Sequence, residues 1–136
     1  MKTRFTWLAV AALLASGAFA QSRGQHAAAI TPVGVWRGTS TCLVRQSACN
    51  DEIAVYRIAQ GNTADSVMID GRKVVNGKEL QMGVLPCRFA AKTGLLTCLL
   101  PQGNWLFRLH GDSLTGELRH PDGTKFRDVR TTRVRP

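Results

Sequence analysis

Residues 104–119 read NWLFRLHGDSLTGELR, and the pattern of this stretch decides the fold. Large apolar side chains fall at every second position between residues 105 and 109, which is the period of a β-strand. Gly111-Asp112 then marks a turn, and alternation resumes over residues 114–119. The stretch therefore predicts a β-hairpin with one apolar face.

The same organisation extends from this hairpin toward both ends of the chain. Short strand-like segments follow one another, and residues such as glycine, asparagine, aspartate and proline mark turns between them. The segments are 35–42, 52–58, 66–70, a short one around 74–75, 80–89, 95–100, 104–110, 114–119 and 125–134. No comparable stretch has the apolar period of a helix.

These segments predict a single all-β domain over residues 33–136. Regularly spaced short strands are typical of sandwiches and barrels, and short connections favour an up-and-down order. Closing such a sheet into a barrel removes the exposed edges that a lone sheet would present. We therefore expect a small antiparallel up-and-down barrel of about eight strands, with a sandwich as the alternative.

The N-terminus has the three parts of a secretory signal peptide. Lys2 and Arg4 are followed by an apolar run over residues 5–15, and Ala18-Phe19-Ala20 is an A-x-A cleavage pattern. The apolar run is shorter than the roughly twenty residues that a membrane span needs. We predict a signal peptide over 1–20 with cleavage after Ala20, a flexible leader over 21–32, and a secreted or periplasmic location.

Four cysteines follow the leader, and an even number in an exported chain predicts two disulfides. Their spacing does not match the short cysteine pairs of zinc sites. We favour local bridges, Cys42 with Cys49 and Cys87 with Cys98, among the three possible pairings. A turn centred in residues 91–94 would place Cys87 opposite Cys98, although a bulge at Gly94 would shift that register by one residue.

Gly34-Val35-Trp36 at the start of the first strand and the basic last strand resemble the calycin pattern, best known in lipocalins. In that family the tryptophan lies at the closed end of the barrel and a basic side chain of the last strand packs across it. The resemblance implies that Trp36 is buried under Arg130, or else under Arg133. The stretch 36–42 and residues 51–52 also resemble small, uncharacterised secreted bacterial proteins, which implies no activity.

The chain is basic, with a formal net charge of +9 at pH 7. A basic surface favours acidic partners such as nucleic acid, anionic polysaccharide or anionic lipid. No block of consecutive lysines and arginines exists, which argues against specific nucleic-acid binding. On an extended last strand, Arg127, Arg133 and Arg135 share the face opposite Arg130, and we expect these three to contact an anionic surface weakly.

The sequence carries no constellation that predicts an enzyme. The nucleophile-elbow, zinc-protease and phosphate-loop motifs are absent. Asp51 and Glu52 are adjacent, so on a strand they point to opposite faces. His110 near Asp112 and Ser113 falls on a turn signal, where such residues bond locally. We expect no catalysis, no cofactor and no metal site, including one formed by His110 with His120.

A non-catalytic binding module is the leading functional hypothesis. An eight-stranded barrel is just wide enough for packed side chains or for one small ligand. If the interior is hollow, we expect a small apolar or amphipathic ligand; if it is solid, the same side chains form the core. The inward candidates are Tyr56, Met68, Phe89, Leu96 and Phe107. The alternatives are an interaction module that resembles small inhibitors of secreted proteases and uses residues 21–32, or envelope association through the arginines.

Overall fold

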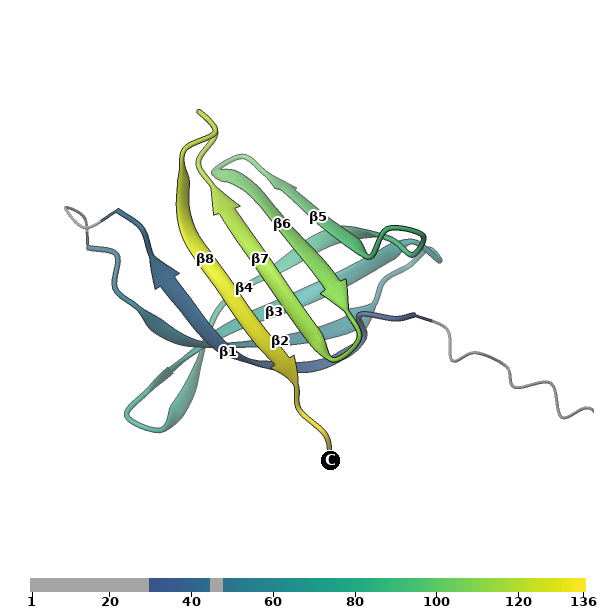
Figure 1. The fold of residues 1–136 in the computed structure, drawn as a ribbon, viewed down its shortest axis with the longest axis horizontal. Coiled ribbons are helices and arrows are strands. Elements are labelled where there is room, and N and C mark those ends of the chain that lie inside the picture. The colour runs from purple at the N-terminus through teal and green to yellow at the C-terminus, as the bar shows by residue number, and fades with distance from the viewer. Residues whose placement is uncertain (1–29, 45–47) are drawn as a thin grey trace, which may run out of the picture.

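The computed structural model describes residues 30–44 and 48–136, which form a closed antiparallel barrel (Figure 1). Each strand pairs with the next along the chain, and the last pairs with the first, so the prediction of an all-β up-and-down barrel is confirmed. None of the described residues forms a helix long and apolar enough to cross a membrane. The strands are β1 (Gly34–Cys42), β2 (Glu52–Gln60), β3 (Ser66–Val75), β4 (Lys78–Ala90), β5 (Leu95–Leu100), β6 (Gly103–His110), β7 (Ser113–Arg119) and β8 (Lys125–Arg133).

The β3–β4 hairpin is longer than the sequence pattern indicates. The short segment expected around residues 74–75 is the end of β3, and it turns into β4 at Asn76 and Gly77. These residues have φ of 50° and 76°, the left-handed backbone that a tight Asn-Gly hairpin turn requires. A register shift next to Gly71 leaves Met82 as an extra residue in β4. The hairpin consequently projects beyond the rest of the barrel (Figure 1).

Both local disulfides are confirmed. Cys42 is bonded to Cys49, and Cys87 is bonded to Cys98 across the β4–β5 hairpin. The hairpin keeps the simple register, because Ala90 pairs with Leu95 and the turn closes through the Gly94 N–H, which donates to the Ala90 carbonyl at 2.9 Å. Two disulfides indicate an oxidising compartment. The expected signal peptide over 1–20 and residues 21–29 of the leader lie outside the described residues.

Trp36 lies fully buried at one end of the barrel, where the chain before β1 covers it. Its indole N–H donates to the Pro32 carbonyl at 2.8 Å, and Pro32 is itself buried. The guanidinium carbon of Arg133 lies 4.2 Å from the centre of the Trp36 ring, and Arg133 Nη1 donates to the Val33 carbonyl at 2.7 Å. Residues 31–33 therefore close this end of the barrel. Residue 33 is also the first residue of the predicted domain.

The choice of Arg130 as the partner of Trp36 is wrong, and Arg133 takes that place. Val129 and Thr131 are the buried residues of β8, so Arg130 between them points outward and is exposed. Arg133 has the inward parity of Thr131 and reaches the closed end. A basic side chain of the last strand does stack on Trp36, and it is Arg133, the second of the two predicted partners.

The middle of the barrel is filled by apolar side chains. Tyr56 and Phe107 meet edge to face, with ring centres 5.3 Å apart and planes at 69°. Gly116 on β7 makes room for this pair, because a Cβ there would lie 2.5 Å from Phe107 Cδ1. The other fully buried side chains around them include Ile69, Leu96, Leu114 and Val129. A solid core therefore occupies the barrel between the closed end and the opposite mouth.

Candidate functional site

A cavity of about 450 Å³ opens at the end of the barrel opposite Trp36. Its walls come from strands on all sides, at the end where β1 finishes and β2 begins. Apolar side chains form one part of the lining, chiefly Met82, Leu85, Trp105, Leu118 and Phe126. Ser40, Glu52, Tyr56 and Arg127 form the polar part. The site is therefore amphipathic.

Arg127 turns into this cavity from the start of β8. Its Nη1 donates to the hydroxyl of Ser40 at 3.1 Å and to the Ser40 carbonyl at 3.3 Å, and its Nη2 lies 3.5 Å from Glu52 Oε1. Lys73 Nζ approaches the same Glu52 oxygen at 3.6 Å. Only 12% of the Arg127 side chain is exposed, so its charge is largely removed from water. One carboxylate thus faces two cations at the mouth.

Tyr56 lies between this polar group and the solid core. Burial raises the pKa of its phenol above the ordinary value; the nearby Arg127 charge opposes the rise and Glu52 reinforces it. The side chain is 5% exposed, yet its hydroxyl forms no hydrogen bond with any described residue. No fully buried side-chain polar atom of the described residues lacks a partner, so the Tyr56 hydroxyl is accessible from the cavity and is available to a molecule bound there.

Of the five residues predicted to contact a ligand in the interior, Tyr56 alone lines the cavity. Leu96 and Phe107 belong to the solid core, and Phe89 packs against that core while partly buried. Met68 faces outward and is 36% exposed, so its inward assignment is wrong. The reason is parity on β3: the neighbours of Met68, Val67 and Ile69, are the buried residues of that strand.

The three arginines predicted to face an anionic surface all contact other groups of the protein, and of the three Arg135 is exposed. Arg127 lines the cavity and Arg133 covers Trp36, so their assignment to the solvent face is wrong. Arg135 is exposed and forms an ion pair with Asp112, which Arg133 also approaches. Each of these three arginines therefore has a partner within the protein. The sequence analysis did not predict that Arg127 and Glu52 line the cavity. The signal for Arg127 was the apolar Val129, because residues 127 and 129 share one face of a strand.

The inhibitor hypothesis depends on residues 21–32. Residues 21–29 of that segment lie outside the described residues. Thr31 and Pro32 lie against the closed end, since Arg133 Nη2 donates to the Thr31 carbonyl at 2.9 Å and Pro32 is buried. Inhibition through the leader stays a prediction.

Fold and cavity together define a class: a small, disulfide-bonded, closed eight-stranded barrel with one sealed end and one open mouth. This architecture is consistent with a calycin-like fold. No protein-family model matches the chain, and no curated protein matches it significantly.

Proposed function

We propose that this protein is an exported, calycin-like barrel that binds one small amphipathic molecule in its mouth without chemically changing it. The observation that carries the proposal is the Tyr56 hydroxyl, which faces an amphipathic cavity and has no hydrogen-bond partner among the described residues. Ligand pockets are commonly about 300–1,000 Å³, lined by apolar walls with a few polar groups. The cavity of about 450 Å³ lies in the lower part of that range, which favours a small ligand.

The two parts of the lining support one orientation for such a ligand. The apolar part would pack against Leu85, Trp105 and Leu118, and the polar head would bond to the Tyr56 hydroxyl beside Arg127. A head group with a negative charge fits best, because Glu52 alone faces the cations Lys73 and Arg127.

The chemistry of the polar groups supports binding rather than catalysis. The Tyr56 phenol, whose pKa burial raises further, is protonated at neutral pH and serves as a hydrogen-bonding group. Arg127 is held by Ser40 and Glu52 in a fixed position. The calycin-like assignment draws its support from the Trp36–Arg133 contact, and export from the N-terminal sequence and the disulfides.

Gly83 provides a direct test of the cavity. It lines the cavity, and a Cβ built on it would meet nothing within 4 Å. Gly83→Leu should therefore fill the space while the fold is retained. The probe is 1-anilinonaphthalene-8-sulfonate, an anionic amphiphile, followed by its own fluorescence and by the tryptophan emission of the protein.

We expect the unaltered barrel to bind this probe at one site and Gly83→Leu to abolish binding. Tyr56→Phe should weaken binding about three- to tenfold, the value of one net hydrogen bond. Met68→Ala on the outer surface is the matched control and should leave affinity unchanged. Undiminished binding by folded Gly83→Leu would refute the proposal.

A further inference from the structure

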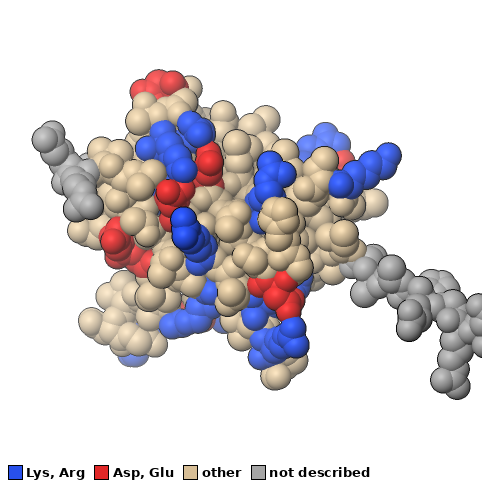
Figure 2. Space-filling model, viewed as in Figure 1, with Lys and Arg blue, Asp and Glu red and all other residues tan. Residues whose placement is uncertain are grey.

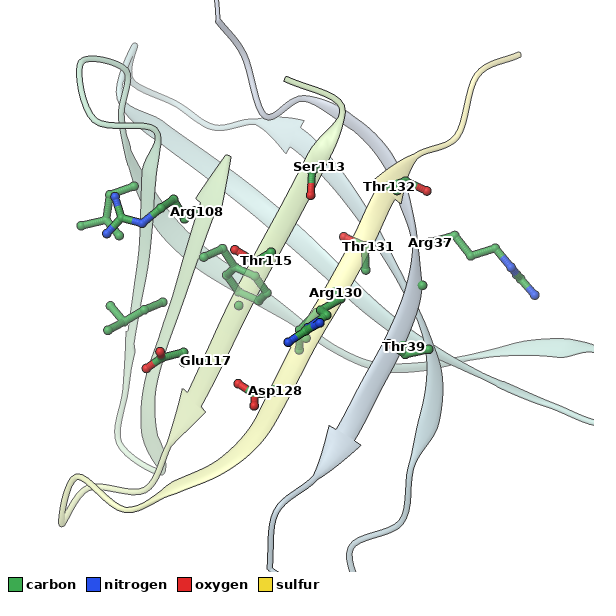
Figure 3. Close-up of a pocket in the computed structure, with 16 residues that line it drawn as sticks. Arg37, Thr39, Arg108, Ser113, Thr115, Glu117, Asp128, Arg130, Thr131 and Thr132 are labelled. Carbon is green, nitrogen blue, oxygen red and sulfur yellow. The ribbon is translucent and has the colours of Figure 1, made fainter. Parts of the chain in front are cut away.

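The outer face of the barrel over β1, β8, β7 and β6 carries a second concavity, a groove of about 720 Å³ (Figure 3). The register aligns four outward residues across these strands, because Arg130 pairs with Thr39 on one side and with Thr115 on the other, and Thr115 pairs with Arg108. We call Thr39, Arg130, Thr115 and Arg108 the arginine–threonine row. Arg37 lies beside it on β1.

The arginines of this face have no carboxylate partners. Most lysines and arginines that the structure describes form ion pairs, among them Arg127, Arg133 and Arg135. Arg37, Arg108 and Arg130 are exposed and form none with any described residue. Figure 2 shows the molecule with β6, β7 and β8 toward the reader, and basic side chains are spread over this face.

The acidic residues at one end of the groove are already neutralised. Glu117 lies 2.7 Å from Arg119 Nη2, and Asp128 lies 2.6 Å from Lys125 Nζ. The hydrogen bond from Arg119 holds the pKa of the Glu117 carboxyl below its ordinary value, and the charge of Lys125 adds to this effect. The positive charge of the arginine–threonine row is therefore not cancelled from within the protein.

Two glycines in the groove lining, Gly38 and Gly116, occupy strand positions whose side chains point into the barrel. A Cβ on Gly38 would lie 2.0 Å from the Arg130 carbonyl oxygen, so only glycine lets β1 approach β8 this closely. A Cβ on Gly116 would instead meet the Phe107 ring inside the barrel. On the outer face, the short side chains of Thr39 and Thr115 let a ligand lie close to the strands, within reach of both the arginine side chains and the threonine hydroxyls.

We propose that this face binds an extended acidic polysaccharide. Neighbouring strands lie about 4.8 Å apart, so Arg108 and Arg130, separated by β7, project about 10 Å from each other. One small anion would reach one or two of these cations, whereas a chain of acidic sugars running across the strands would reach all of them. Guanidinium groups bind carboxylates and sulfates in pairs of hydrogen bonds, and Thr39 and Thr115 between them match sugar hydroxyls.

The composition of the face favours a sugar chain over other polyanions. The aromatic side chains of these four strands, Trp36, Trp105, Phe107 and Phe126, belong to the core or the mouth cavity, so none forms an outer stacking platform for bases. The partly exposed large apolar side chains of the groove lining are Leu95 and Leu106, which give a membrane little to bury. This inference is independent of the ligand proposed for the mouth.

Two charge-matched variants test it. The first combines Arg37→Gln, Arg108→Gln and Arg130→Gln; the second combines Lys78→Gln, Arg88→Gln and Lys92→Gln, which removes three exposed cations away from the groove. Binding of the mature chain to alginate and to heparin, with neutral dextran as the reference, is measured by titration calorimetry at low and physiological salt.

We expect binding to alginate or heparin that salt weakens, and no binding to dextran. The groove variant should lose about tenfold or more in affinity, and the control variant less than about threefold. Thermal denaturation of both variants establishes that they are folded. Equal losses in the two variants, or binding of a short DNA duplex as tightly as the polysaccharides, would overturn the proposal.

Discussion

Replacing Arg133 by methionine tests the seal at the closed end. The change removes the hydrogen bond to the Val33 carbonyl at 2.7 Å, the bond to Thr31 and the contact with the Trp36 ring, and it retains a long apolar side chain. A charge-assisted hydrogen bond in a partly buried position contributes about 1.5 kcal/mol, and the cation–π contact about 1 kcal/mol. The exposed bond to Thr31 and the pair with Asp112 add little. We expect a loss of about 2–3 kcal/mol in the free energy of unfolding.

The assay is urea denaturation followed by tryptophan fluorescence, with the slope of the transition compared between variants. Arg130→Met is the matched control, because Arg130 lies on the same strand, is exposed, and has no ion-pair partner among the described residues. It should change stability by less than about 0.5 kcal/mol. If Arg130→Met costs as much as Arg133→Met, the assignment of Arg133 to the closed end is wrong.

Three further changes probe the rest of the barrel. Gly116→Ala places a methyl group against the Phe107 ring and should cost about 1–3 kcal/mol in thermal denaturation, with no loss indicating a looser core than the contacts show. Tyr56 is the single tyrosine of the chain, and burial raises its pKa in the folded protein. Only the unfolded chain ionises this phenol near its ordinary pKa, so the free energy of unfolding should fall above about pH 10. The absorbance of tyrosinate should therefore appear only when the protein unfolds. A paired Cys87→Ser and Cys98→Ser variant should unfold about 2–4 kcal/mol more easily, with an unchanged urea midpoint contradicting a structural role for the bridge.

Local pattern was enough to predict most of the strands. Period-two alternation and turn residues are local signals, so β5 and the hairpin between β6 and β7 lie close to their expected positions. The β4–β5 register followed from one turn and two cysteines. The sequence also contains Asn76-Gly77, the dipeptide typical of a tight hairpin turn. This turn signal predicts that residues 74–75 belong to the end of β3.

The face of the last strand that turns inward could not be read from that strand alone. Arg127, Val129, Thr131 and Arg133 share the inner face, and two of these four are charged. The charged residues lie inward because the barrel ends are where solvent and backbone carbonyls can receive them, whereas Val129 sits at the level of the core. Pairing with β1 and β7 decides this parity, and those partners are distant in sequence. The same parity determines which residues of β8 line the cavity, so Arg127 was not predicted to be one of them.

The bond between Cys87 and Cys98 spans the turn at residues 91–94, and Lys92 at the tip of that turn is exposed. Cleavage of the peptide bond after Lys92 by trypsin would leave two polypeptides, one ending with β4 and the other beginning with β5. The disulfide would still join them, and the remaining strand pairs would hold both pieces in one barrel. A nick at this tip would therefore be invisible on a non-reducing gel and would appear as two fragments only after reduction.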